Sequence, residues 1–216
     1  MHDDPKILLP DCSIHIRGRI RLFCPFFSFS SMGDVLRVSL IQTNIVWEDK
    51  RANLDKYAVI LSHITGDCDL VVFPEMFTTG FSMRAEDLAE CIDGETITEV
   101  KKSRNYNVAI AGSFIARAGN VCFNRGFFIE PDGSEHYYDK RHLFRMGEEG
   151  RHFVSGSEKL VVNYRGWNIC LLVCYDLRFP VWCRNVGNEY DLLLFVANWP
   201  QSRSYAWRNL LIARAI

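Results

Sequence analysis

Three side chains of complementary chemistry follow apolar runs in the sequence. Glu75 comes after DLVVFP, Lys140 after EHYYD and Cys174 after WNICLLV. If these runs are strands that point the same way, their ends share one edge of a sheet, where α/β proteins bind ligands. A thiol, a carboxylate and an ammonium at that edge can serve as nucleophile, proton acceptor and stabiliser of an oxyanion. The pattern therefore indicates a nucleophilic site built around Cys174.

Each member of this group has a definite chemical role. A free thiol has a pKa of about 8.5 and is mostly protonated at pH 7, so Glu75 would accept its proton and return it to leaving ammonia. Lys140 would favour the thiolate and stabilise the tetrahedral intermediate, with the backbone N–H of Tyr175 as a second donor. Structural interpretations stay open beside these roles: a solvent-facing Glu75, a solvated turn at Lys140 and a core thiol at Cys174.

Alternating strands and helices must position these side chains. Apolar runs predict strands over 35–41, 69–73, 108–114 and 191–196, and hairpins that join 126–129 to 135–138 and 159–164 to 167–173. Apolar residues at helical spacing predict helices over 51–64, 95–104, 180–186 and 203–216. Short buried strands that alternate with helices and hairpins are typical of an α/β domain whose helices cover the faces of a sheet.

Composition and charge exclude several classes of function. The chain has 216 residues, of which 48% are hydrophobic, so disorder cannot describe the whole chain. Lys+Arg number 25 and Asp+Glu 26, which leaves a net charge of −1 and no basic excess for nucleic-acid binding. No apolar run approaches the roughly 18 residues of a membrane span. We therefore expect a partner that is neither nucleic acid nor membrane.

The cysteines and histidines give no sign of a metal centre. Eight cysteines and six histidines are present, but no C-x-x-C or H-x-x-x-H spacing occurs. The chain is long and apolar enough to fold without disulfides. We therefore expect free thiols, most of them in the core, in a reducing and cytoplasmic compartment, with no metal and no cofactor.

The two ends of the chain differ from the rest. Residues 1–33 contain a basic stretch over 15–21, an apolar stretch over 22–29 that Pro25 interrupts, and two serines, which together resemble a weak signal peptide. We expect residues 1–33 to be a disordered extension outside the domain, with Met32 as the natural start, and the domain to occupy 34–216. The helix over 203–216 has no C-cap signal, so we expect the domain to be incomplete at its C-terminus.

Four longer segments resemble the nitrilase, or carbon–nitrogen hydrolase, superfamily, and within it the omega-amidase branch of 2-oxoglutaramate amidases. They are VVFPEMFTTGFSM (71–83), YDKRHLFRMGEE (138–149), LLVCYDLRFPVW (171–182) and FVANWP (195–200). The resemblance runs from about residue 35 to the last residue. It implies an α-β-β-α sandwich of two mixed sheets paired through their helices, a homodimer formed by helices near 180–187 and 203–216, and no cofactor. Because family chains continue past residue 216, it also implies a missing C-terminal part.

The resemblance also assigns the site. It implies a catalytic triad of Glu75, Lys140 and Cys174, and a second glutamate, Glu149, that orients Lys140 or the substrate. Arg178 is expected to support the site or to pair with a carboxylate. Three aromatic residues are expected to wall the substrate pocket, although core packing explains them equally well: Phe77, Phe81 and Trp199.

The implied reaction is amide hydrolysis in two halves. Cys174 attacks the side-chain amide, ammonia leaves, and water hydrolyses the resulting thioester. The implied substrates are small-molecule ω-amides of 2-oxo acids, such as 2-oxoglutaramate. Two alternatives stay open: another amidase, nitrilase or N-carbamoyl hydrolase of the same superfamily, and a non-enzymatic protein, either an inactive truncated homologue or a dimerising partner.

Overall fold

Two mixed sheets form the centre of the molecule. The computed structural model describes residues 13–16, 35–64 and 68–216. The six-stranded sheet contains, in spatial order, β1 (Ser13–Ile16), β2 (Leu36–Leu40), β3 (Leu70–Val72), β4 (Ala109–Ala118), β5 (Val121–Ile129) and β6 (Glu135–Asp139). The three-stranded sheet contains β7 (Leu160–Tyr164), β8 (Trp167–Val173) and β9 (Leu192–Val196).

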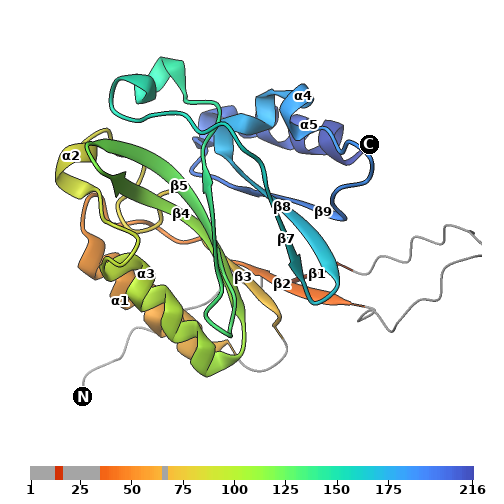
Figure 1. Cartoon of the computed structure of the whole chain (residues 1–216), viewed down its shortest axis with the longest axis horizontal. Coiled ribbons are helices and arrows are strands. Elements are labelled where there is room, and N and C mark those ends of the chain that lie inside the picture. The colour runs from red at the N-terminus through yellow and green to blue at the C-terminus, as the bar shows by residue number, and fades with distance from the viewer. Residues whose placement is uncertain (1–12, 17–34, 65–67) are drawn as a thin grey trace, which may run out of the picture.

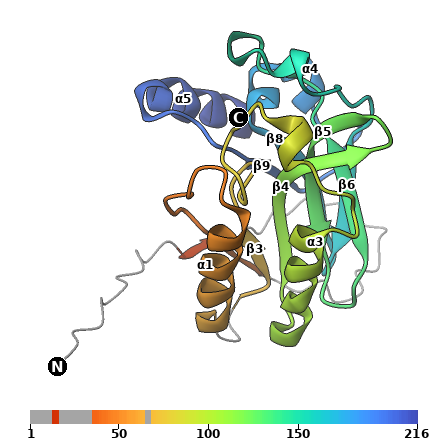
Figure 2. The ribbon, with the colours of Figure 1, turned by 90° about the vertical axis from the view of Figure 1, so that its left-hand side faces the viewer.

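Helices surround the two sheets. The α-helices are α1 (Lys50–His63), α2 (Ala85–Leu88), α3 (Glu95–Val100), α4 (Pro180–Cys183) and α5 (Ser204–Ala215). Short 3-10 helices are η1 (Lys101–Tyr106), η2 (Arg145–Gly147), η3 (Glu149–Arg151), η4 (Cys174–Arg178) and η5 (Gln201–Arg203). The helices α1 and α3 lie side by side on one face of the six-stranded sheet, whereas α4 and α5 lie with the three-stranded sheet (Figures 1 and 2).

The two sheets pack directly against each other. One buried cluster joins residues of β2 to β6, such as Val38 and Phe128, to residues of β7 to β9, such as Ile169 and Val196. Gly126 permits the close approach, because a Cβ atom there would lie 3.3 Å from Val173. The expected α/β sandwich of two mixed sheets is therefore confirmed, but its pairing through helices is wrong. The strands carry apolar side chains on both faces, and one face of each sheet covers the other.

A second cluster lies on the outer face of the six-stranded sheet. Apolar residues of α1 and α3 pack there against the far side of β3 and β4. The helix α1 buries Leu54, Tyr57 and Leu61, which follow the helical period noted in the sequence. Its first turn is capped by the Asp49 side chain, which accepts a hydrogen bond of 3.0 Å from Ala52 N–H.

Most predicted elements agree with the structure to within one or two residues. Two differ more. The strand β5 begins at Val121 instead of residue 126 and forms a long hairpin with β4, because the polar residues Asn124 and Arg125 interrupt its apolar pattern but are both partnered. The helix α4 ends at Cys183, since Arg184 is extended (φ −61°, ψ 132°).

Residues of the predicted N-terminal extension are described in one place only. Ser13–Ile16 form β1, which pairs antiparallel with β2 from Ser13↔Ser39 to Ile16↔Leu36. This short strand differs from the disorder expected for residues 1–33, because the edge of β2 offers free backbone hydrogen-bonding groups. The rest of that extension lies outside the described residues. Of the helices in the described part, none is long and apolar enough to cross a membrane.

Candidate active site

Glu75 follows β3 in a tight turn. Met76, the next residue, has a φ of +47°, in the left-handed region that non-glycine residues seldom occupy. The backbone N–H of Met76 donates to Ser113 Oγ on the neighbouring strand β4 at 2.9 Å, which holds the turn in place. The turn directs the Glu75 side chain inward, where it is completely buried.

Lys140 follows β6 and is also completely buried. Its backbone N–H donates to Asn124 O on β5 at 3.0 Å, and its carbonyl accepts from Gly156 N–H at 3.0 Å. Only glycine fits at 156, because a Cβ atom there would lie 2.1 Å from Asp139 O. Lys140 Nζ contacts Glu75 Oε1 at 2.8 Å, and this contact brings together the ends of β3 and β6.

Cys174 occupies the sharp turn between β8 and η4. Its φ is +46°, and residues held in this region need support from their surroundings. Asp176 supplies that support, since its buried carboxylate accepts from Val173 N–H at 3.1 Å and from His142 N–H at 2.9 Å. Tyr138 OH also donates to it, at 2.7 Å. The thiol of Cys174 is thereby fixed at the end of β8.

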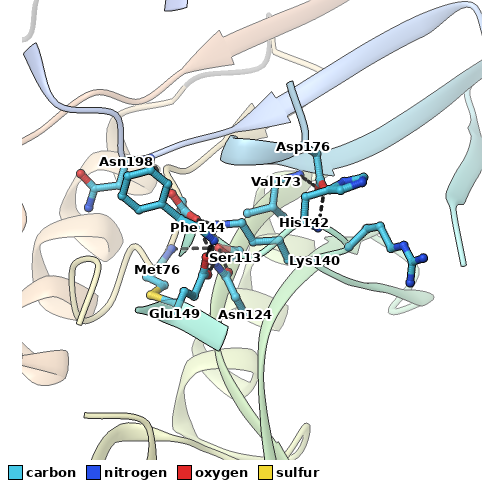
Figure 3. A network of polar contacts seen from close by, with 12 residues as sticks. Met76, Ser113, Asn124, Lys140, His142, Phe144, Glu149, Val173, Asp176 and Asn198 are labelled. Carbon is cyan, nitrogen blue, oxygen red and sulfur yellow. Dashed lines mark hydrogen bonds and ion pairs between the residues drawn. The ribbon is translucent and has the colours of Figure 1, made fainter. Parts of the chain in front are cut away.

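The second glutamate lies on the same ammonium. Both carboxylate oxygens of Glu149 accept from Lys140 Nζ at 3.0 Å, and Oε2 also accepts from Phe144 N–H at 2.6 Å. Asn124 connects the two glutamates, because its Nδ2 donates to Glu75 Oε1 at 2.8 Å and to Glu149 Oε1 at 3.0 Å. Figure 3 shows Asn124, Lys140 and Glu149 converging from different elements.

Burial and charge set the protonation states at this site. Burial alone would lower the pKa of Lys140, but the two carboxylates outweigh it, so the pKa lies above its ordinary value. Burial raises the pKa of Glu149 against the opposing effect of Lys140. Burial, and then the charge of Glu75, raise the pKa of the Cys174 thiol well above its usual range, although Lys140 opposes both. The resting thiol is therefore protonated: Lys140 favours the thiolate, but its effect is smaller than those of burial and Glu75.

A cavity of about 290 Å³ opens onto this group. Its lining includes Glu75, Lys140 and Cys174, so the structure brings together all three residues that the sequence singled out. The other predicted residues in its wall are Phe81, Tyr175, Arg178 and Trp199. Residues in the wall that the sequence did not single out are Trp47, Phe144, Asn198, Pro200 and Arg203.

Phe77 does not line this cavity, and its expected contact with substrate is wrong. Its side chain is completely buried and packs against Tyr57, Phe73 and Phe127, with ring centroids between 4.9 and 5.9 Å apart. The turn at Met76 directs it to the outer face of the sheet, under α1. Phe81 lies five residues after the turn and reaches the cavity, with its ring 5.2 Å from Lys140 Nζ.

Sequence reasoning gave no role to two asparagines of the site. Asn198 N–H donates to Glu75 Oε2 at 3.0 Å from the end of β9. Asn124 lies in the middle of β5, and the signal for it was a polar residue among the apolar residues of a buried strand. Among the described residues, no group of three His, Cys, Asp or Glu side chains is placed to hold a metal ion.

Comparison with known proteins decides the family. The model of the family described as carbon-nitrogen hydrolase matches residues 37–216. The chain belongs to the carbon-nitrogen hydrolase family. It is therefore a hydrolase, and the fold and the predicted family agree.

Relatives of this carbon-nitrogen hydrolase include proteins with assigned activities. The chain is 48% identical over 181 residues to the omega-amidase YafV of Escherichia coli strain K12, which covers 84% of the chain and 70% of the relative. It is 31% identical over 184 residues to the 2-oxoglutaramate amidase of Bacillus subtilis strain 168, and the match covers 83% of the chain and 71% of that relative. A crystal structure of a CN-hydrolase superfamily protein from Xanthomonas campestris, with an arsenic adduct in its active site, matches with a TM-score of 0.82 and 47% identity, over 84% of this chain and 71% of that one.

Proposed function

We propose that this carbon-nitrogen hydrolase is an omega-amidase, which hydrolyses the side-chain amide of 2-oxo-acid ω-amides such as 2-oxoglutaramate to the dicarboxylate and ammonia. The observation that carries the proposal is the convergence of Glu75, Lys140 and Cys174 on one cavity, with the thiol at its wall. Relatives named omega-amidase and 2-oxoglutaramate amidase support the choice of substrate.

In the first half of the reaction, Cys174 acts as the nucleophile and Glu75 as the base. Glu75 removes the thiol proton as the sulfur forms a bond to the amide carbon, because a thiol with a raised pKa is a poor nucleophile until its proton is taken. Lys140 and the backbone N–H of Tyr175 stabilise the oxyanion of the tetrahedral intermediate. Glu75 then gives the proton to the amide nitrogen, the C–N bond breaks, and ammonia leaves a thioester on Cys174.

In the second half, water replaces ammonia. Glu75 removes a proton from water while the oxygen attacks the thioester carbon, and a second tetrahedral intermediate forms at the same donors. The C–S bond breaks, the sulfur regains a proton from Glu75, and the carboxylic acid product is released. Glu149 is proposed to orient Lys140 throughout, since both its oxygens contact Nζ at 3.0 Å.

Two arginines in the lining of the cavity support an anionic substrate. The guanidinium of Arg178 lies over the ring of Trp199 at 5.5 Å, and that of Arg203 lies over the ring of Phe144 at 5.3 Å. In the described part of the chain, neither guanidinium forms an ion pair with a carboxylate. Guanidinium groups recognise carboxylates through paired hydrogen bonds. We therefore assign these two arginines to the carboxylate of the 2-oxo acid, with Phe81 and Trp199 as apolar walls.

Two properties of the whole molecule belong to the proposal. We propose a homodimer through α4 and α5, because exposed apolar side chains gather on and beside these helices: Val181, Val186, Tyr205 and Ile212. A molar mass of one protomer by light scattering would contradict it. We also propose that the domain occupies residues 34–216, with β1 as an added strand at the edge of its sheet. We propose a cytoplasmic location, since the cysteines of the described residues are free thiols, the state that a reducing compartment maintains.

Substitution of the nucleophile tests the function. Wild type is expected to release ammonia from 2-oxoglutaramate, and Cys174→Ala is expected to abolish release without changing the unfolding midpoint. Cys91→Ala is the matched control, because Cys91 is exposed and lies outside the cavity. Mass spectrometry of quenched wild type should show an acyl adduct on Cys174. Unchanged turnover in Cys174→Ala would refute the proposed chemistry.

A further inference from the structure

A buried chain of hydrogen bonds leads from the turn at Met76 to the two glutamates. Met76 N–H donates to Ser113 Oγ at 2.9 Å, and Ser113 Oγ donates to Asn124 Oδ1 at 3.0 Å. Asn124 Nδ2 then donates to Oε1 of both Glu75 and Glu149. None of these five residues is exposed to solvent, so water does not compete for the contacts.

Each hydrogen bond in this chain has a definite direction. A backbone N–H can only donate, so Ser113 Oγ accepts from Met76. Ser113 Oγ donates its single hydrogen to Asn124 Oδ1, and the amide nitrogen of Asn124 faces the two carboxylates, which accept one hydrogen each. A proton on either Oε1 atom would oppose an N–H hydrogen, so both Oε1 atoms of Glu75 and Glu149 are held unprotonated.

This arrangement distinguishes the two oxygens of Glu75. Oε1 accepts from both Lys140 Nζ at 2.8 Å and Asn124 Nδ2 at 2.8 Å, which occupies its two lone pairs. Oε2 accepts from Asn198 N–H at 3.0 Å, its single donor among the described residues. The remaining lone pair for a proton is therefore on Oε2.

Asn124 also holds the ammonium in place through its backbone. Its backbone carbonyl accepts from Lys140 N–H at 3.0 Å. Asn124 therefore fixes both the backbone of Lys140 and the two carboxylates that face the Lys140 ammonium. Its position in the middle of β5, paired with Ile115 of β4, gives it less freedom than a residue on a loop.

We infer that Asn124 is a positioning residue for the reaction, which keeps both glutamates unprotonated at Oε1 and directs the proton of Cys174 to Oε2 of Glu75. The inference rests on the proposed function, in which Glu75 is the base. Because Asn124 donates to Glu149, it lowers the pKa of that carboxyl against the effect of burial. Loss of the donor should make the buried site take up a proton at a higher pH.

The sharpest test is the isosteric variant Asn124→Asp. The carboxylate keeps the shape and still accepts from Ser113, but it turns two donated hydrogen bonds into repulsion with Glu75 and Glu149. We expect kcat for ammonia release to fall by about 100-fold, the scale of lost general-base catalysis, with KM changed less than about threefold. The acidic limb of the kcat profile should move up by about one pH unit. Asn124→Ala is expected to shift the same limb in the same direction, and it covers the case in which the aspartate variant does not fold.

The matched control is Asn53→Asp, at a second fully buried asparagine. Its amide donates only to backbone carbonyls, those of Val46, Asp49 and Thr78, so the change should lower stability without moving the acidic limb. An equal shift of the limb in Asn53→Asp would show a general structural effect and overturn the inference.

A readout without the amide substrate separates this inference from the proposed function. The rate of Cys174 alkylation by iodoacetamide is followed on the Cys174 peptide from pH 5 to 9 in wild type, Asn124→Asp and Asn124→Ala. An upward shift of the acidic limb of this rate in both variants supports the inference even if wild type releases no ammonia, which would refute only the proposed function. Alkylation and turnover profiles that coincide with wild type in both variants would overturn the role of Asn124.

Discussion

Removal of the buried ammonium is the most informative perturbation of the site. In Lys140→Met, an apolar chain of similar length replaces the group that contacts Glu75 Oε1 at 2.8 Å and both oxygens of Glu149 at 3.0 Å. The two carboxylates remain completely buried, with no cation between them. Breaking a buried ion pair on one side commonly costs about 3–5 kcal/mol, because the other charge is left without a partner.

The magnitude follows from the charge of the site. In wild type, Glu75, Glu149 and Lys140 together carry a charge of −1. In the variant the two glutamates carry −2, and the charge returns to −1 if one of them takes up a proton. Protonation of a glutamate with an ordinary pKa of about 4.3 costs about 3.7 kcal/mol at pH 7, at about 1.4 kcal/mol per pH unit. We therefore expect Lys140→Met to lose about 4 kcal/mol of unfolding free energy at pH 7.

The same reasoning fixes the pH dependence of this loss. In the variant, the folded state binds one proton more than the unfolded state between the raised carboxyl pKa and about pH 4.3, so stability falls as pH rises in that window. The difference in unfolding free energy between wild type and Lys140→Met should shrink by about 1.4 kcal/mol for each unit by which the pH is lowered from 7.5 to 5.5. Urea unfolding of both proteins at the two pH values measures the difference directly.

Two further variants show whether the carboxylates cause the effect. Lys159→Met removes the ammonium that contacts Glu189 Oε1 at 2.6 Å near the surface, and such a pair is worth less than about 1 kcal/mol. Lys140→Met combined with Glu149→Gln should lose less stability than Lys140→Met alone, because only one buried carboxylate remains. Equal unfolding midpoints of Lys140→Met and wild type at pH 7.5, or a loss that is the same at pH 5.5, would refute the reasoning.

Two remaining predictions concern the cavity and the core. Arg178→Leu should raise KM for 2-oxoglutaramate by about 10- to 100-fold, the value of a charge-assisted hydrogen bond, while kcat stays within about threefold; initial rates test it, and an equal effect on an uncharged amide would contradict a carboxylate contact. Phe77→Ala should cost about 3–5 kcal/mol of unfolding free energy in denaturant with little change in KM, because the ring fills the core under α1; a large rise in KM at unchanged stability would place the ring in the pocket instead.

The strand ends were predictable from the sequence, and the reason is local. The apolar runs DLVVF and WNICLLV correspond to β3 and β8, and each run ends within one residue of the strand. Glu75 and Cys174, which follow these runs, reach the site. The resemblance of four segments to known hydrolases added Glu149, which no pattern of strands would have singled out. Glu149 and Lys140 both lie in the segment between β6 and β7, and the folding of this segment brings them into contact.

Contacts across the sheet were not predictable in the same way. Asn124 meets the glutamates because β5 pairs with β4 in the register Ile115↔Asn124 and Ser113↔Gly126, which brings the amide beside Ser113. Nothing local in the sequence specifies that register. The direction of Phe77 depends on the left-handed turn at Met76, which leaves Glu75 before it and Phe81 after it in the cavity wall while Phe77 packs in the core.

The polar groups around Glu75 explain why a buried site with excess negative charge is tolerable. One ammonium balances one carboxylate, and the other charge is stabilised by neutral donors, namely Asn124 Nδ2, Asn198 N–H and Phe144 N–H. A second cation would favour the thiolate, whereas neutral donors leave the Cys174 thiol protonated until a carbonyl is present. When the proton moves to Glu75 and the oxyanion forms, the charge of the buried group remains −1. Attack by the sulfur therefore moves a negative charge from Glu75, which Lys140 already contacts, to the oxyanion. No additional charge has to be buried as the bond to sulfur forms.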